Sequence, residues 1–118
     1  MSNEATREQA RQILKKGILD MNIARLIQMT QFGLMGNISL SRNNIAVKNG
    51  FNHIDYDDEY DIMTFSVQQM EGTYGEISFF IGAITDISGS EDKENPDEYL
   101  NINIMLKDKT QIEIKVLY

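Results

Sequence analysis

Residues 100–118 read LNINIMLKDKTQIEIKVLY, and apolar side chains fall on every second position on both sides of a short polar interruption. A period of two is typical of a strand with one buried face, so the stretch predicts a β-hairpin. The residues predicted to face inward all carry even numbers: Leu100, Ile102, Ile104, Leu106, Ile112, Ile114, Val116 and Tyr118.

The length of the hairpin loop decides whether the two apolar rows share a face. A three-residue loop at 108–110 would pair Leu106 with Ile112 and Ile104 with Ile114, whereas a two-residue turn would put the rows on opposite faces. The loop lacks the Gly or Asn that usually takes the left-handed conformation there. A bulge in a differently paired hairpin therefore stays open as an alternative.

The region before this hairpin divides into an apolar and a polar part. Residues 76–87 read EISFFIGAITDI and are apolar on both faces, which predicts either a central strand covered on both sides or a strand sharply bent at Gly82. Residues 88–98 read SGSEDKENPDE, contain no apolar side chain and hold the only proline. We predict a solvated, mobile acidic loop at 88–98.

The first third of the chain contains one clear helix signal. Asn3 or Ser2 can cap a helix over about residues 4–16, with Gly17 as its terminator. Residues 18–31 fit either a helical stripe or an alternating strand. The apolar residues outside the helical stripe favour the strand.

The Asn-Gly dipeptide at 49–50 is typical of a two-residue hairpin turn, in which both central residues have positive φ. The resulting hairpin pairs Ile45 with Ile54 and places His53 opposite Ala46. The neighbouring residues 42–44 are predicted to form a further turn.

The middle of the chain predicts one more strand. Met63, Phe65 and Val67 share one face of it, and residues 71–75 turn it back into the apolar stretch that begins at Glu76. Together these elements predict an α+β fold. We expect an N-terminal helix packed on a curled antiparallel β-sheet, or a small β-barrel, of five to seven strands.

Length and composition narrow the class of protein. The 118 residues are expected to form a single domain, 1–118, which buries roughly two-thirds of the surface of its unfolded chain. Cysteine is absent, which excludes thiol nucleophiles, Cys-ligated zinc and iron–sulfur clusters. The polar start MSNEATREQ is not a secretory signal, and no apolar run is long enough to span a bilayer. A cytoplasmic location is expected.

Charge is unevenly distributed along the chain. The net charge of −7 divides into +4 over residues 1–50 and −11 over residues 51–118. One interpretation is that folding brings the halves together and the surface field averages out. The other is that the basic end docks on an acidic partner, including another copy of the chain.

The densest cluster of carboxylates lies in residues 55–61, DYDDEYD. Alternating carboxylates are typical of calcium loops, but Tyr60 and Ser66 stand where such a loop needs Gly and Glu, so a solvated turn is favoured over a metal site. We predict instead that this cluster binds a protein partner through Asp55, Asp57, Asp58, Glu59 and Asp61.

Two further classes of function are disfavoured by the sequence. His53 is the only histidine and no G-x-S-x-G, H-E-x-x-H or Gly-rich phosphate loop is present, so an enzyme that uses His53 with a carboxylate is a weaker alternative. A helix-turn-helix regulator over residues 22–50 would need a helix across Asn43 and Asn44, which are turn formers. Neither an enzyme nor direct nucleic-acid binding is expected.

The sequence therefore predicts a non-enzymatic protein–protein interaction module, of the kind found among small bacterial or phage accessory, immunity or inhibitor proteins. The alternative is an acidic mimic of nucleic acid that blocks a nucleic-acid-binding protein, with residues 55–61 joined by the acidic residues of the 88–98 loop. No cofactor and no metal are expected. The expected partner is a protein with a basic surface, self-association stays open, and no membrane contact is expected.

Overall fold

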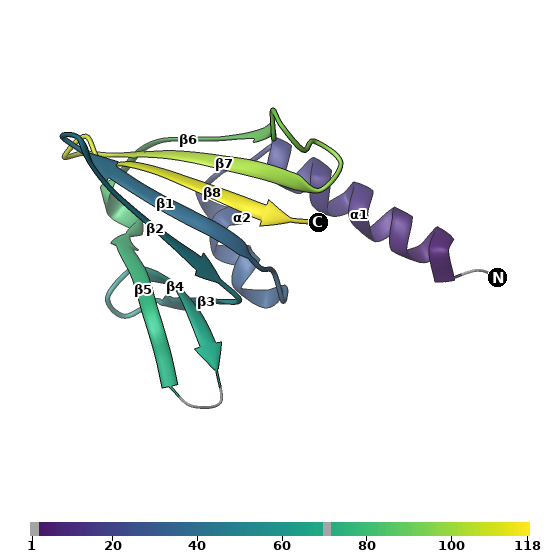
Figure 1. Cartoon of the computed structure of the whole chain (residues 1–118), viewed down its shortest axis with the longest axis horizontal. Coiled ribbons are helices and arrows are strands. Elements are labelled where there is room, and N and C mark those ends of the chain that lie inside the picture. Colours follow the sequence, from purple (N-terminus) through teal and green to yellow (C-terminus); the bar gives the residue numbers. More distant parts are fainter. Residues whose placement is uncertain (1–2, 70–71) are drawn as a thin grey trace.

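Two antiparallel sheets and two helices make up the part of the chain that the computed structural model describes, residues 3–69 and 72–118 (Figure 1). The helical elements are α1 (Asn3–Leu19), α2 (Ile23–Gln28) and the short 3-10 helices η1 (Met29–Gln31) and η2 (Ile81–Ala83). The strands are β1 (Gly36–Arg42), β2 (Ile45–Phe51), β3 (His53–Asp57), β4 (Ile62–Gln69), β5 (Gly72–Phe80), β6 (Ile84–Glu91), β7 (Tyr99–Leu106) and β8 (Gln111–Leu117). The predicted α+β class is confirmed.

The strands form a five-stranded sheet in the order β2-β1-β8-β7-β6 and a three-stranded sheet in the order β3-β4-β5. The chain passes between the sheets at two corners, through the single residue Asn52 between β2 and β3 and through η2 between β5 and β6. No closed barrel is formed by the described strands. The predicted packing of an N-terminal helix on an antiparallel sheet of five strands is confirmed, whereas the barrel and the total of at most seven strands were wrong. The extra strand arises because η2 divides residues 76–87 between the two sheets.

The C-terminal hairpin of β7 and β8 is confirmed, but its register differs from the predicted one. Ile104 pairs with Ile112 and Ile102 pairs with Ile114. The loop consists of residues 107–109, closed by hydrogen bonds from Leu106 N to Thr110 O (2.9 Å) and from Lys109 N to Leu106 O (3.0 Å). Lys109 takes the left-handed conformation (φ 72°) that was expected to require Gly or Asn, which moves the loop by one residue.

The observed pairing is shifted by two residues from the predicted one, since Ile104 pairs with Ile112 and not with Ile114. A shift by an even number leaves odd and even residues on their predicted faces. The even-numbered residues of β7 and β8 lie on the face of the five-stranded sheet that we call the inner face, and the odd-numbered residues lie on the outer face. Seven of the eight residues predicted to face inward are buried, and Tyr118 is half-buried. The core was thus correctly predicted here.

The first hairpin uses a different turn from the predicted one. Asn43 and Asn44, with φ of 50° and 68°, form the two-residue turn between β1 and β2, so residues 42–44 are a turn as predicted. Residues 49–50 lie inside β2, which corrects the predicted Asn-Gly turn and its pairing of Ile45 with Ile54. The straight β2 carries Phe51 into the core, where its ring meets Phe65 edge-on at 5.0 Å. The strands on both sides of the turn also rule out the helix-turn-helix interpretation.

α1 runs three residues past its predicted end. Gly17 lies inside the helix and does not terminate it, because the extra turn buries Ile18 against the sheet, which offsets the cost of roughly 1 kcal/mol for a glycine in a helix. A Cβ on Gly89 of β6 would overlap the carbonyl oxygen of Ile18, so this glycine lets α1 cross the inner face. Asn3 is itself the first residue of α1, and Ser2 lies outside the described residues.

Residues 18–31, predicted as a strand, contain the end of α1, all of α2 and η1. Asn22 caps α2, since its Oδ1 accepts a hydrogen bond from Arg25 N at 2.9 Å. Leu26 and Met29 face the core. A helix of six residues is too short to show a clear period, which is why the alternation suggested a strand.

The two predictions upstream of the C-terminal hairpin were each right in part. Residues 76–87 are not one central strand but bend at η2, which contains Gly82. Ser88–Glu91 extend β6, so the acidic loop is shorter than the predicted 88–98. Of the predicted turn 71–75, residue 71 lies outside the described residues and the rest belongs to β5.

Candidate functional site

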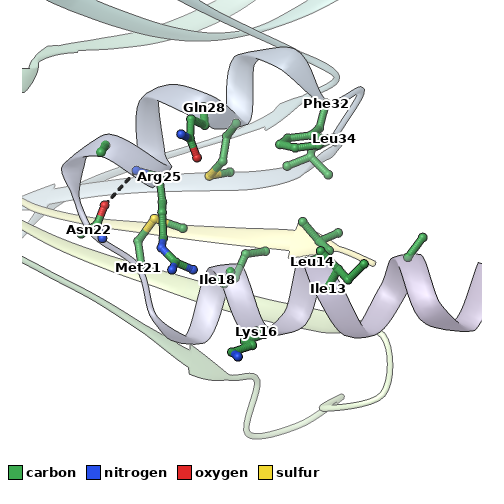
Figure 2. Close-up of a pocket in the computed structure, with 14 residues that line it drawn as sticks. Ile13, Leu14, Lys16, Ile18, Met21, Asn22, Arg25, Gln28, Phe32 and Leu34 are labelled. Atoms are coloured by element: carbon green, nitrogen blue, oxygen red, sulfur yellow. Dashed lines mark hydrogen bonds between the residues drawn. The ribbon is translucent and has the colours of Figure 1, made fainter.

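A groove of about 910 Å³ lies between α1 and α2 (Figure 2). α1 lies on one side of it, and α2, η1 and the segment leading to β1 lie on the other. Its apolar lining comes from Ala10, Ile13, Leu14, Ile18, Met21, Ala24, Met29, Phe32 and Leu34. The residues of α1 in this list follow a helical spacing, so they form one stripe along the helix.

The groove is apolar but uncovered. Ile13 is 74% exposed and Phe32 is 56% exposed, on opposite sides of the groove. In Figure 1 the N-terminal part of α1 projects beyond the sheets, and residues 4–10 are all exposed. The stripe on α1 therefore begins where the helix packs on the sheet and continues to where no described residue covers it.

Arg25 is the charged side chain that reaches into the groove. In Figure 2 it extends from α2 toward α1, whereas Lys16 points away. The side chain is half-buried, and no hydrogen bond or ion pair joins its guanidinium to another residue in the described ranges 3–69 and 72–118. A partly desolvated guanidinium without a partner favours an anion, above all a carboxylate that it can bind through two hydrogen bonds.

Local features of both helices position this arginine. The Asn22 cap fixes the start of α2 and therefore the direction in which Arg25 leaves the helix. Gly17 lies directly opposite on α1, and a Cβ there would be 3.8 Å from Nη1 of Arg25. This distance is an ordinary van der Waals contact, so the guanidinium lies directly against α1 at Gly17.

The opposite side of α1 is fixed to the end of the molecule where β7 begins. Lys15 Nζ lies 3.2 Å from Glu91, and Arg11 donates a hydrogen bond to the carbonyl of Asp97 at 2.8 Å. Arg11 also lies over the Tyr118 ring, 4.7 Å from its centroid. Folding therefore brings part of the basic N-terminal half against the acidic half of the same chain, and α1 is held in the position that opens the groove.

The predicted partner-binding carboxylates of residues 55–61 have two kinds of surroundings. Asp57 accepts hydrogen bonds from the backbone of Glu59 and Tyr60 and so shapes the turn. Asp61 accepts a hydrogen bond from the Tyr56 hydroxyl at 2.7 Å and one from Gly82 N at 2.9 Å. The hydrogen bond to Asp61, together with desolvation and the neighbouring carboxylates, raises the pKa of Tyr56.

Asp55, Asp58 and Glu59 are exposed, and the prediction that they bind a partner stays a prediction. Within the described residues, no group of three or more His, Asp or Glu side chains is arranged to hold a metal ion.

The two acidic stretches of the proposed nucleic-acid mimic lie apart. Asp61 contacts η2, which is next to the end of β7 through the hydrogen bond from Lys107 N to Ala83 O. Asp92 lies at the other end of β7, where its N–H donates to Tyr99 O. The eight residues of β7 separate the two stretches by roughly 25 Å, so a mimic would need two separate contacts with its partner.

His53 does not face Ala46 but pairs with Ser66 of β4, and Ser66 pairs with Glu76 of β5. The three side chains therefore share a row on one face of the three-stranded sheet. No side-chain hydrogen bond joins any two of these three described residues, and Ser66 is buried while Glu76 is exposed. Nucleophilic catalysis would need the serine and the histidine in hydrogen-bond contact, which this arrangement does not provide.

A polar depression of about 410 Å³ lies on the outer face. At its base Asp92, which is only 5% exposed, accepts hydrogen bonds from Asn95 N at 2.8 Å and from Asn101 Nδ2 at 3.2 Å and lies 3.3 Å from Lys115 Nζ. The hydrogen bond from Asn95 and those from Asn101 and Lys115 lower the pKa of Asp92. The Asp92 carboxylate is therefore already paired within the chain. Its hydrogen bond from Asn95 N anchors the loop between β6 and β7.

The groove was not found from the sequence. Its α2 half was predicted as a strand, which removed Arg25 from any helix–helix surface. The signal that could have found it was Asn22 followed by a short apolar run, since Asn is among the strongest helix-capping residues.

No protein-family model matches the chain, and neither the curated proteins nor the solved structures include a significant match. No helix among the described residues is long and apolar enough to cross a membrane. The function is therefore argued from the geometry of the groove.

Proposed function

We propose that the protein is a non-enzymatic interaction module whose α1–α2 groove binds an amphipathic helical segment of a partner protein with a carboxylate at the position of Arg25. The observation that carries the proposal is the half-buried guanidinium of Arg25, which has no partner among the described residues and lies in a mostly apolar groove. An apolar face of a helix lying in such a groove is a common mode of peptide recognition.

The apolar contacts would supply most of the affinity. Ile13 and Phe32 are largely exposed in the free protein, and burying apolar surface contributes about 25 cal/mol per Å². Arg25 would supply the selection for acidic over basic segments, because pairing it with a carboxylate replaces water that the groove partly excludes. None of the described residues that line the groove carries a carboxylate or imidazole that could act as a general base, so binding is the chemistry that these residues support.

The proposal is tested with two fluorescent helical peptides that share one apolar stripe and differ in their flanking charges, glutamate in one and lysine in the other. Binding of the full chain to each is measured by fluorescence anisotropy. We expect the acidic peptide to bind roughly tenfold more tightly, and the difference to shrink at high salt, where exposed charges are screened. Equal affinities for the two peptides would contradict the role given to Arg25.

Variants separate the two parts of the site. Arg25→Gln should reduce the affinity for the acidic peptide to that for the basic one, whereas Ile13→Lys should weaken both. Arg42→Gln is the matched control, because Arg42 is an exposed arginine on β1 that pairs with Asp108 and not with the groove. Circular dichroism verifies that each variant is folded.

A small amphiphile with the same chemistry, apolar with one carboxylate, is the competing occupant. The groove volume is within the range of small-ligand pockets, so oleate is added as a competitor. Oleate that displaces the acidic peptide at equimolar concentration, and loses this ability in Arg25→Gln, would overturn the peptide interpretation in favour of a lipid carrier.

A further inference from the structure

The free edge of β2 is a second unpartnered surface, on the opposite side of the five-stranded sheet from β6. Its first four residues, Ile45–Lys48, are all exposed. Ile45 is 70% exposed and Val47 is 51% exposed, although both lie on the inner face of the sheet. An exposed edge strand with β-branched apolar residues is a template for pairing with another strand.

Two of the other edges in the described part of the chain, β6 and β3, carry protection that β2 lacks. β6 has a bulge between Ile84 and Asp86, and Lys15 of α1 covers its end at Glu91. β3 presents Asp55 and Asp57. Bulges, charges and covering helices all hinder strand addition, whereas the exposed half of β2 has only Lys48 and no proline or bulge.

The hydrogen-bond phase of β2 shows which backbone groups are free. In the two-residue turn at Asn43 and Asn44, the N–H of Ile45 bonds to the carbonyl of Arg42 across the turn. Because the bonds of an antiparallel pair alternate, Val47 also directs its N–H and C=O toward β1. Ala46 and Lys48 therefore direct theirs outward.

We propose that a second copy of the chain pairs antiparallel with this edge about a two-fold axis at Ala46, so that the two five-stranded sheets become one continuous sheet. In this register Ala46 is opposite Ala46 of the second copy, and Ile45 is opposite Val47. Residues of the same parity face each other, so the inner faces of both copies lie on the same side.

In this register the exposed part of β2 is complementary to the same part of a second copy. For this reason we assign a second copy, and not another protein, to this edge. Ile45 and Val47 of the two copies bury one another and extend the apolar row that already runs through Leu40 and Ile112. Lys48 is opposite Asn44, so the two Lys48 ammonium groups do not meet. The free N–H and C=O groups of Ala46 pair reciprocally with those of its counterpart.

The dimer should be weak. A contact of about four residues on each side buries on the order of 800 Å² in total, which is below the roughly 1,200 Å² of a standard specific interface and fits a transient contact. Each copy also has a net charge of −7, so the copies repel one another at low salt. Added salt is therefore expected to strengthen the dimer, whereas it weakens binding of an acidic peptide to the groove.

Disulfide trapping tests the register directly, since the chain has no cysteine of its own. Ala46→Cys places two thiols opposite one another at about 5.5 Å between Cα atoms, which is within disulfide range. Under mild oxidation it should form covalent dimers at least tenfold faster than Ser88→Cys, an exposed control on β6. Equal rates for the two variants would overturn the proposed register.

Sedimentation velocity tests the equilibrium, at protein concentrations of about 20 to 500 µM and in about 50 and 500 mM NaCl. The native chain should show a dimer fraction that rises with concentration and with salt. Val47→Lys should abolish it, and Ile13→Lys in the groove should leave it unchanged. A native chain that stays monomeric throughout, or a dimer that survives Val47→Lys, would overturn the proposal.

Discussion

The two faces of the five-stranded sheet are made by the same strands, but one is buried and the other is exposed to solvent. On the inner face Leu100, Ile102 and Ile114 are completely buried beneath the helices and the three-stranded sheet. On the outer face Asn103 and Glu113, their neighbours in sequence, are exposed. Alternation therefore determines which face is buried, but the elements that cover that face come from segments that do not alternate.

The largest expected effect is on the inner face. Ile114→Ala should lower the free energy of unfolding by about 3–4 kcal/mol, because it removes buried methyl groups and leaves a cavity at the centre of the sheet. Urea denaturation followed by circular dichroism measures the change. Glu113→Ala on the same strand is the control for the outer face and should change stability by less than about 0.5 kcal/mol. Similar losses for the two variants would remove the distinction between the faces.

The next effect concerns what covers the inner face. Gly89→Ala places a methyl group against the Ile18 carbonyl, so α1 must shift away from β6. We expect a loss of about 2–3 kcal/mol, as for other overpacked sites, together with faster amide exchange in the last turn of α1. Gly33→Ala is the matched control, because a Cβ there meets nothing within 4 Å. Unchanged exchange in α1 would contradict the close crossing at Gly89.

The same contrast explains how much of the fold could be predicted. The C-terminal hairpin was predicted well because eight alternating positions outweigh any local uncertainty, so even a wrong register left each side chain on its correct face. The N-terminal region was predicted less well. Six residues of α2 cannot show a helical period, and Gly17 was given its usual role as a terminator although burial of Ile18 continues the helix.

The position of the turn between β1 and β2 was predicted wrongly for another reason. Asn43-Asn44 and Asn49-Gly50 both tolerate positive φ, and local turn preference alone favours the second pair. Contacts between distant residues favour the turn at Asn43-Asn44, because β2 then continues through residues 49–50 and brings Phe51 to Phe65. The groove was missed as a consequence of the N-terminal errors, since a site between two helices cannot be inferred when one of them is predicted as a strand.

A smaller effect is expected on the outer face, where Asp92 is the one buried charged residue in the described ranges. Its pKa is lower in the folded chain than the usual 3.8, mainly through the hydrogen bond from Asn95. The stabilisation it provides is therefore complete above the unfolded pKa and is lost as the pH falls through the folded one. Asp92→Asn should be less stable than the native chain at pH 7, by less than the loss in Gly89→Ala.

The pH dependence of that difference is the decisive measurement. Urea titrations at a series of pH values should give a constant difference between the native chain and Asp92→Asn from pH 7 to about pH 5, which shrinks below about pH 4. Asp86→Asn, an exposed aspartate on β6, should differ little from the native chain at any of these pH values. A difference for Asp92→Asn that grows toward acid would show that the ion pair with Lys115 does not stabilise the fold.

The smallest effect is expected at the turn between β7 and β8, which sets the register of these two strands. Lys109 has φ of 72°, a conformation that costs a side-chain-bearing residue about 1 kcal/mol and glycine almost nothing. Lys109→Gly should therefore raise the free energy of unfolding by about 0.5 kcal/mol, after allowance for the greater freedom of glycine in the unfolded chain. Asn44→Gly, at φ of 68°, should gain less, because Asn already tolerates this conformation. The contact between Ile104 and Ile112 in nuclear Overhauser spectra must persist in Lys109→Gly, since a gain in stability with a changed register would mean that the lysine, and not the apolar rows, selects the pairing.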